Sequence, residues 1–348
     1  MFADRIEGKW IDAFCEIFAR CAVKAGDSAA ILSETQSRRL NVQLAELALL
    51  RLGARPFHIV VPSPRNTHPV PVRSTGASEA IGKLAPVVTA LGQAGFVVDC
   101  SIEGLMHAPE TPTILKAGAR ILVISNEHPE ALERMRPDTA LETRVRAAAK
   151  MLRGARRMTV ASAAGTNLHI DLTGAATVGV WGWTDRPGTL AHWPGGLVVS
   201  FCKSGSVNGT LVLDRGDINL TFKRYLESPL RLTLEDDYVT AIEGDGAEAR
   251  LMRGYLAAWG DREAYAVSHV GFGLNDKARY EALSMYDRQH LNGTELRAVA
   301  GNFLFSTGAN EFAGRYTAGH FDIPVLGTTI RVDDTEVISA GVLKDVFG

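Results

Sequence analysis

The N-terminal part of the chain alternates between two periods of apolar side chains. In residues 10–24 the apolar positions recur at helical spacing, which predicts an amphipathic helix. Further helices are predicted at 41–52 and 81–91. The short apolar runs that suit buried strands are 29–32, 56–61, 96–99 and 121–124. Strands and helices that alternate in this order predict a parallel sheet with helices on both of its faces.

The second half of the chain has a different sequence pattern, with alternating apolar segments and many glycines. The strands predicted there are 159–162, 168–172, 197–200, 210–213, 230–234 and 264–270. Helices are predicted at 143–152 and 248–259. We therefore expect an α/β protein of two domains with a boundary near 153–158. Residues 1–155 form a doubly wound parallel-sheet domain, and 156–348 form a β-rich α+β domain.

Composition and charge narrow the possible partners. The formal net charge of -2 carries no basic excess, so we expect no nucleic-acid partner. No apolar run reaches the ~20 residues needed to span a bilayer, and the N-terminus has no apolar signal core, so we expect a cytoplasmic protein without membrane contact. The 4 cysteines are scattered and form no CxxC pair, which fits a reduced compartment.

Three residues could form a metal site. His320 and Asp322 point to the same side if their segment is extended, because a strand has a period of two. His269 ends an apolar run just before Gly271 and Gly273. Two imidazoles and one carboxylate are the facial triad of non-haem iron(II) oxygenases. From the residues alone, an ordinary hydrogen-bonded His–Asp pair and a histidine that caps a strand stay open as alternatives.

A further histidine has a position suited to catalysis. His107 follows the predicted strand 96–99, and ligands of doubly wound sheets bind beyond the carboxyl ends of the strands. An imidazole there suits a general base, although a solvent-exposed loop histidine is the alternative. The motifs of other enzyme classes are missing from the sequence. It has no complete GxGxxG fingerprint, no phosphate-binding GxxxxGK[ST] loop and no GxSxG elbow of serine hydrolases.

Several motifs, in one order along nearly the whole chain, resemble a known family. They lie in 108–122, 185–194, 209–218, 268–274, 301–308 and 320–324. Together they resemble the 2,5-dihydroxypyridine 5,6-dioxygenases, which belong to the superfamily of the thermophilic aminopeptidases. The resemblance implies an enzyme that opens the ring of 2,5-dihydroxypyridine, or of a closely related hydroxypyridine, with O₂. It implies N-formylmaleamate as the product and no organic reductant.

The resemblance also assigns roles to residues. It implies Fe(II) held by His269, His320 and Asp322, and it makes His107 the base that acts on the substrate. The residues that it places along the substrate pocket are Arg297, Ser306 and His192. The expected partners are a small N-heteroaromatic substrate, O₂ and further copies of the chain in a homo-oligomer.

Two positions depart from related patterns. The aminopeptidase branch bridges two metal ions with a glutamate in a Pro-x-Gly-Glu segment, and the comparable stretch here ends in Leu197. Leucine offers no oxygen, which favours one metal over the alternative of a metallo-aminopeptidase-like hydrolase. Val180 aligns with a glutamate of the dihydroxypyridine enzymes. This difference implies a less acidic pocket and keeps a differently substituted hydroxypyridine open as the substrate.

Overall fold

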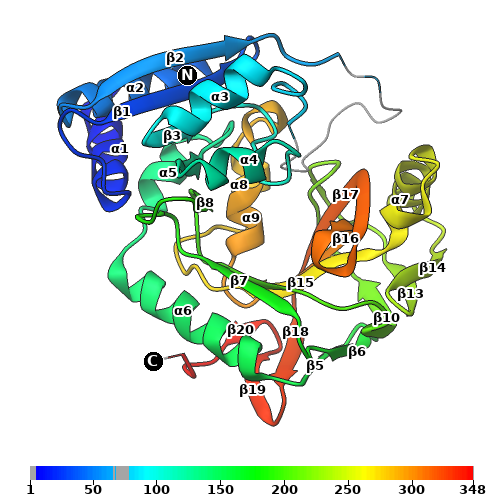
Figure 1. The fold of residues 1–348 in the computed structure, drawn as a ribbon. Coiled ribbons are helices and arrows are strands. Elements are labelled where there is room, and N and C mark those ends of the chain that lie inside the picture. Colours follow the sequence, from blue (N-terminus) through cyan, green and yellow to red (C-terminus); the bar gives the residue numbers. More distant parts are fainter. Residues whose placement is uncertain (1–4, 66, 68–77, 348) are drawn as a thin grey trace.

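A computed structural model describes residues 5–65, 67 and 78–347. Its first unit is built on a five-stranded parallel sheet in the order β2-β1-β3-β4-β8 (Figure 1). The strands are β1 Ser28–Glu34, β2 Arg55–Val61, β3 Phe96–Asp99, β4 Arg120–Val123 and β8 Leu190–His192. The helices are α1 Gly8–Arg20, α2 Arg39–Arg51, α3 Ala85–Gln93, α4 Thr111–Lys116 and α5 Pro129–Arg134.

The two faces of this sheet are covered by different helices. Ala29 and Ile31 of β1 belong to the core that includes α1, α2 and α5. Ala30 and Leu32 belong to the core on the side of α3 and α4. Alternate residues of one strand thus lie in opposite cores. A doubly wound sheet has this pattern because helices cover both of its faces. The predicted fold class is confirmed for this half.

Most of the predicted elements are present, and many begin or end a few residues away from the predicted bounds. For three of them the structure shows a local cause. The first helix ends at Arg20 rather than residue 24, and Ala22 has a left-handed φ of 56°. The helix predicted to begin at 81 starts at Ala85, after the left-handed Lys83. The strand predicted at 264–270 is β15, which starts at Val267 because Arg262–Tyr265 form a 3₁₀ turn. The short helices α4 and α5 were not predicted.

The second unit consists mainly of two antiparallel sheets. The larger has the order β14-β13-β10-β6-β5-β18-β19-β20, and the smaller has the order β17-β16-β15-β9-β7. The strands of the larger sheet are β5 Arg157–Ser162, β6 Asn167–Asp171, β10 Val207–Leu213, β13 Leu230–Glu235, β14 Tyr238–Glu243, β18 Thr328–Val332, β19 Thr335–Ser339 and β20 Val342–Leu343. Those of the smaller sheet are β7 Ala176–Val180, β9 Leu197–Phe201, β15 Val267–Gly273, β16 Phe303–Asn310 and β17 Arg315–Val325. One apolar core joins both sheets to the helices α6 Thr139–Gly154 and α7 Ala247–Ala258.

Short elements connect the two units. They are β11 Ile218–Asn219, β12 Arg224–Tyr225, α8 Ala282–Met285, the 3₁₀ turn Arg288–His290 and α9 Thr294–Ala298. In Figure 1, α8 and α9 run from the parallel-sheet unit toward the strands below it. No helix among the described residues is long and apolar enough to cross a membrane.

The chain passes between the two units more than once. The helix α6 packs against β7 and β9 of the second unit, and its Val145 and Ala148 are part of that core. The strand β8 returns to pair with β4 in the parallel sheet. Residues 139–154 and 190–192 therefore each pack with the half of the chain opposite to the one assigned from sequence. The boundary near 153–158 stays a prediction.

Candidate active site

The strands β15, β16 and β17 align one row of polar side chains. His269 of β15 is opposite Ser306 of β16, which is opposite Asp322 of β17. Their neighbours Val270 and Phe305 lie in the apolar core. Because strand residues alternate between faces, His269, Ser306 and Asp322 share the face of the sheet that is turned away from this core. His320, two residues before Asp322, is on the same face.

Two imidazoles and one carboxylate meet on this face. The Nε2 atom of His320 is 3.2 Å from Oδ1 of Asp322, and Nε2 of His269 is 3.8 Å from the same oxygen. One nitrogen or oxygen atom from each of the three residues lies within 4.8 Å of the others. All three residues are buried, with exposed fractions of 7%, 8% and 5% for His269, His320 and Asp322. The structure thus brings together the three ligands predicted from sequence.

The charge states of these groups fit a divalent cation. Burial lowers the pKa of His269 to about 3, so this imidazole is neutral and keeps a lone pair. Burial opposes ionisation of Asp322, but the positive charge of Arg297 and the contact with His320 hold its pKa well below the usual range. The Nδ1 atom of His269 is buried without a hydrogen-bond partner. Neutral imidazole nitrogen and ionised carboxylate oxygen are the donors that Fe(II) and similar ions take in oxygenase sites.

A glycine makes room for His320 in the β16–β17 pair. Gly308 lies opposite His320 and has a φ of +124°. A Cβ atom at Gly308 would collide with the carbonyl oxygen of Gly319 and lie 3.1 Å from Nδ1 of His320. Only glycine combines this backbone angle with such a close approach.

Arg297 and Ser306 both contact the Asp322 carboxylate. Arg297, on α9, donates from Nε to Oδ2 of Asp322 over 2.5 Å. Ser306 donates from its hydroxyl to Oδ1 of the same group. Both residues were predicted from the family resemblance to line the substrate pocket, and their contact with substrate stays a prediction. Their contacts hold the orientation of a candidate metal ligand.

His107 and His192 approach the site from the carboxyl edge of the parallel sheet. The ring centroid of His107 is 5.6 Å from that of His320. His192, on β8, has Nδ1 at 2.6 Å from the carbonyl oxygen of Pro194, so Nδ1 carries a proton and Nε2 is an acceptor. Burial lowers the pKa of both histidines to about 4. Both are therefore neutral near pH 7.

Apolar side chains lie beside the candidate metal ligands on the same face of the sheet. Leu197, Val199 and Leu304 form a small cluster, against which Val180 and Phe201 pack. The ring of Phe201 is 5.3 Å from that of His269. Phe201 was not singled out from sequence, because an aromatic residue at the end of a buried apolar strand gives no signal that separates a site residue from a core residue. Leu197 is part of this apolar cluster, so it adds no metal-binding oxygen.

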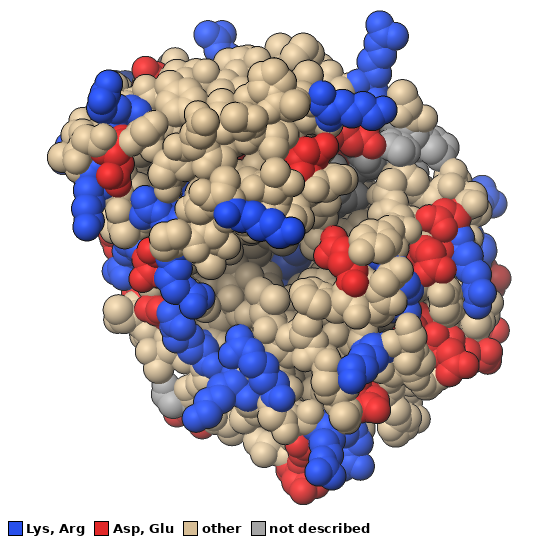
Figure 2. Space-filling view, viewed as in Figure 1, with Lys and Arg blue, Asp and Glu red and all other residues tan. Residues whose placement is uncertain are grey.

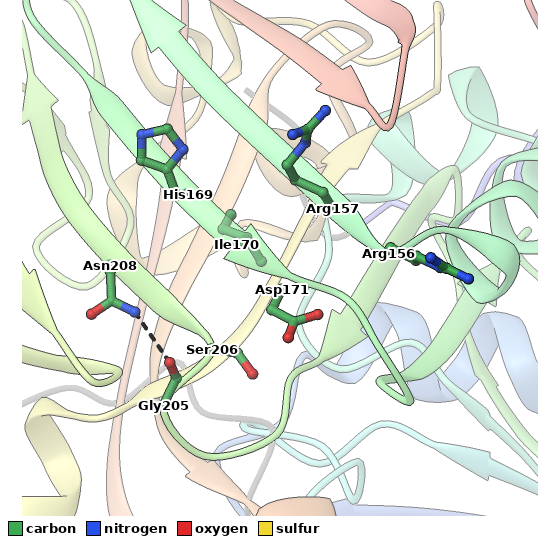
Figure 3. Close-up of a pocket in the computed structure, with 8 residues that line it drawn as sticks. All are labelled: Arg156, Arg157, His169, Ile170, Asp171, Gly205, Ser206 and Asn208. Carbon is green, nitrogen blue, oxygen red and sulfur yellow. Dashed lines mark hydrogen bonds between the residues drawn. The ribbon is translucent and has the colours of Figure 1, made fainter.

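Two hollows on the described part of the chain differ in their position. Figure 2 shows one near the centre of the molecule, between the parallel-sheet unit above and the strands below. A second, open pocket of about 340 Å³ lies on the larger sheet, lined by Arg156, Arg157, His169 and Asp171 among others (Figure 3). Its residues lie in β5 and just before it, in β6, in the segment that leads into β10 and at the start of β10. None of them belongs to the site on β15–β17.

Comparisons with known proteins identify the family of the chain. The family model described as 2,5-dihydroxypyridine 5,6-dioxygenase matches residues 9–345. The 2,5-dihydroxypyridine 5,6-dioxygenase of Pseudomonas putida KT2440 is 38% identical over 321 residues, which cover 90% of each chain. A solved structure of the dioxygenase from this organism superposes with a TM-score of 0.90 at 36% identity, over 97% of each chain.

A more distant solved structure shares the fold. AmpT from Thermus thermophilus superposes with a TM-score of 0.61 at 14% identity, over 96% of this chain and 99% of AmpT. At 14% identity, this similarity shows only that the two proteins share a fold. The extent of the family match and the identity to the Pseudomonas enzyme confirm the resemblance inferred from the motifs. The chain belongs to the 2,5-dihydroxypyridine 5,6-dioxygenase family.

Proposed function

We propose that this protein opens the ring of 2,5-dihydroxypyridine, or of a close hydroxypyridine analogue, with O₂ and Fe(II). Both oxygen atoms enter the product, which is N-formylmaleamate when 2,5-dihydroxypyridine is the substrate. The family membership supports the reaction class. The observation that carries the proposal is the set of three donor atoms, from His269, His320 and Asp322, within 4.8 Å of one another.

These three residues would hold one ferrous ion per chain. When bound, the ion supplies a Lewis acid that lowers the pKa of a substrate hydroxyl and a redox centre that can engage O₂. As ligands, two imidazole nitrogens and one carboxylate would donate a single negative charge to the ion, and the positive charge of Arg297 beside Asp322 offsets part of it. A set of only three protein ligands suits a cation that must also accept substrate and O₂.

His107 is the proton acceptor in this proposal. Because burial holds its pKa near 4, its imidazole is neutral near pH 7 and can take the proton of a substrate hydroxyl. Its ring lies 5.6 Å from that of the candidate ligand His320, on the side of the parallel sheet. A positioned base is worth about 10²–10⁴-fold in rate, so His107 accelerates the reaction without being an absolute requirement.

Other side chains bind and orient the substrate. The apolar cluster of Leu197, Val199 and Leu304, with Val180 beside it, offers a surface for the faces of a flat ring. The Nε2 atom of His192 is an acceptor for a substrate N–H or O–H group, since its Nδ1 is engaged by Pro194. Arg297 and Ser306 keep the Asp322 carboxylate ionised and oriented, and we propose that they also contact substrate.

Peptide hydrolysis is not favoured. A two-metal peptidase needs a bridging carboxylate, and Leu197 instead packs in an apolar cluster with Val199 and Leu304. His107 also has no evident role in such a reaction. Turnover of dipeptides by the metal-loaded protein would support this alternative.

Oxygen uptake tests the proposal. Protein reconstituted with Fe(II) under anaerobic conditions should consume one O₂ per 2,5-dihydroxypyridine, without 2-oxoglutarate or NADH. With ¹⁸O₂, both labelled atoms should appear in the ring-opened product. Incorporation of a single atom, or an obligatory co-substrate, would instead show a monooxygenase. A panel of hydroxypyridines with different substituents tests whether Val180 has changed the preferred ring.

Two further expectations remain proposals. We propose that the protein is cytoplasmic and that it assembles as a homo-oligomer. Fractionation of the native host tests the first, and sedimentation analysis at several protein concentrations tests the second.

A further inference from the structure

The loop that carries His107 begins beside two buried carboxylates. It connects β3 to α4 and leaves the parallel sheet at its carboxyl edge. Asp99 is the last residue of β3, and Glu34 is the last residue of the neighbouring strand β1. Their exposed fractions are 0% and 5%. The proposed reaction uses neither group.

Asp99 accepts hydrogen bonds from the loop on both of its oxygens. Oδ1 accepts from the backbone N–H of Ser101 over 2.9 Å and from the hydroxyl of Ser101 over 2.6 Å. Oδ2 accepts from the backbone N–H of Leu105 over 2.6 Å. Glu34 adds one contact, since its Oε1 accepts from the N–H of Ile102 over 3.1 Å. The two carboxylates thus fix the first part of the loop.

The hydrogen bond between Asp99 and Leu105 also constrains the position of His107. Leu105 and Ala108 are buried in the core on one side of the sheet, at 0% and 2% exposure. The N–H of Ala108 donates to the carbonyl oxygen of Leu105 over 3.1 Å, and so closes a tight turn. His107 lies inside this turn. A displacement of Leu105 would therefore displace the imidazole.

Close packing around Gly104 also restricts the position of this loop. Gly104, which precedes Leu105, has a φ of +80°. A Cβ atom there would lie 2.9 Å from both the Ser125 hydroxyl and Cγ1 of Val123, and 3.6 Å from Oδ2 of Asp99. The loop therefore has little freedom to shift while the carboxylate contacts are in place.

We propose that Asp99 is a positioning residue that holds the loop so that His107 reaches the substrate. The inference rests on the proposed function, because it assigns Asp99 a role through the base. A contribution to the stability of the protein does not explain why a buried aspartate occupies position 99. Its partners are neutral N–H and O–H groups, the nearby charge of Glu34 opposes its ionisation, and burial raises its pKa to about 6. A buried carboxylate without a cationic partner is costly, and its two-oxygen geometry is what the loop needs.

The substitution Asp99→Asn tests the geometry with little change in size. An amide accepts through one oxygen only, so its NH₂ group would face an N–H group of Ser101 or Leu105. We expect kcat for O₂ uptake to fall roughly 10- to 100-fold, because small misplacements of a catalytic group have effects of this order. KM and iron content should stay close to the wild-type values. An unchanged kcat would overturn the proposal.

A double-mutant cycle separates positioning from general damage. If Asp99 acts through the base, Asp99→Asn should cause almost no further loss of kcat in a His107→Ala background. A merely structural role would instead lower kcat by the same factor in both backgrounds. Multiplicative losses would therefore contradict the inference.

Asp217 provides a matched control. It is also buried, burial also raises its pKa to about 6, and its two oxygens accept N–H groups from Leu326 and Asp214, each over 2.7 Å. Asp217→Asn should reduce thermal stability to a similar degree while kcat stays within about 2-fold of wild type. Equal losses of kcat in the two variants, in proportion to the folded fraction, would count against a special role of Asp99.

A milder variant keeps the test decisive if Asp99→Asn does not fold. Ser101→Ala removes the hydroxyl donor and leaves the carboxylate in place. We expect a fall in kcat of a few-fold that disappears in the His107→Ala background. A normal kcat would overturn the proposal in that case. Wild-type turnover is measured first, because an inactive wild-type enzyme would refute the proposed function rather than the role of Asp99.

Discussion

The surroundings of His269, His320 and Asp322 would suit the cation that we propose. Burial keeps the imidazole of His269 neutral, and Arg297 keeps the carboxylate of Asp322 ionised. These buried groups satisfy one another only partly, because Nε2 of His269 is 3.8 Å from Oδ1 of Asp322, which is too far for a hydrogen bond. Such a cluster is costly for folding, so a ligand that completes it is the simplest explanation for its presence.

The first prediction concerns iron binding. Replacement of His269, His320 or Asp322 by alanine should reduce the iron content from one ion per chain to near zero and abolish O₂ uptake, because two remaining ligands hold Fe(II) weakly. Iron is measured by mass spectrometry after anaerobic loading. His169→Ala is the control, since this exposed histidine lies in the pocket on the other sheet. Full iron content and activity in His320→Ala would refute the ligand assignment.

The second prediction concerns the base. His107→Ala should lower kcat by about 10²-fold or more while iron content remains near one per chain, since His107 is proposed to move a proton rather than bind the metal. Rapid O₂ uptake measurements with saturating substrate provide kcat. If this variant retains normal turnover, the base lies elsewhere, and His192, whose Nδ1 is held by Pro194 so that Nε2 is the acceptor, becomes the next residue to replace.

At the scale of secondary structure, the β16–β17 pair determines how His320 is presented. Gly308 is opposite His320, and its left-handed φ and close neighbours leave no room for a side chain. The pair also brings Ser306 to Asp322. We therefore expect the affinity for iron to depend on Gly308, although this glycine has no side chain that could bind a metal ion.

The third prediction tests this dependence. Gly308→Ala should push His320 away from Asp322 and lower the affinity for Fe(II) by about 10–100-fold, the usual effect of disturbing the support of a ligand. Gly314→Ala is the control, because Gly314 lies in the turn between β16 and β17 with a φ of +71° but has nothing within 4 Å of its Cβ position. Both variants carry backbone strain, and only the first collides with its neighbours. Equal iron affinities, measured by competition with a chelator, would argue against the role of Gly308.

The elements show what sequence could and could not predict. Period two correctly put His320 and Asp322 on one face of a strand, and the strand–helix rhythm correctly indicated the parallel sheet. The pairing of Ser306 with Asp322 depends on the register between β16 and β17, which local patterns do not encode. The return of β8 to the first sheet was missed for a similar reason. A three-residue strand has too few positions to show a period.

At the scale of the whole molecule, contacts between the two units support the active site. The helix α9 carries Arg297, which contacts Asp322, and α9 is attached to the parallel-sheet unit near its N-terminal end. Glu127 accepts the N–H of Thr294 over 2.8 Å, and Arg38 donates to the carbonyl oxygen of His290 over 2.9 Å. The approach of His107 to His320 likewise joins the two units. This long-range arrangement is set by packing that no single motif reveals.

The strongest of these contacts is an ion pair between α5 and α9. Arg134 donates from Nη1 to Oε1 of Glu295 over 2.5 Å and from Nη2 to Oε2 over 3.3 Å. The side chain of Glu295 is 0% exposed, and that of Arg134 is 14% exposed. Glu295 lies two residues before Arg297 on the same short helix. Loss of the pair should therefore affect both stability and the active site.

The fourth prediction concerns this pair. Arg134→Met should destabilise the protein by about 3–5 kcal/mol, because it leaves the Glu295 charge buried without its cationic partner. It should also lower kcat by shifting Arg297. Arg144→Met is the matched control: its ion pair with Asp276 also measures 2.5 Å, but the side chains are 33% and 64% exposed. An exposed pair contributes about 0–1 kcal/mol. Urea denaturation gives both values.

A double variant identifies the physical cause of the loss. If the unpaired charge of Glu295 is responsible, Arg134→Met combined with Glu295→Met should recover most of the stability, since apolar side chains of similar volume often replace a buried ion pair without loss. The activity should recover less, because the backbone N–H of Arg279 also donates to Glu295 over 2.8 Å and helps to hold α9 in place. If the double variant is as unstable as Arg134→Met, the loss of stability comes from lost packing of the arginine rather than from a buried charge.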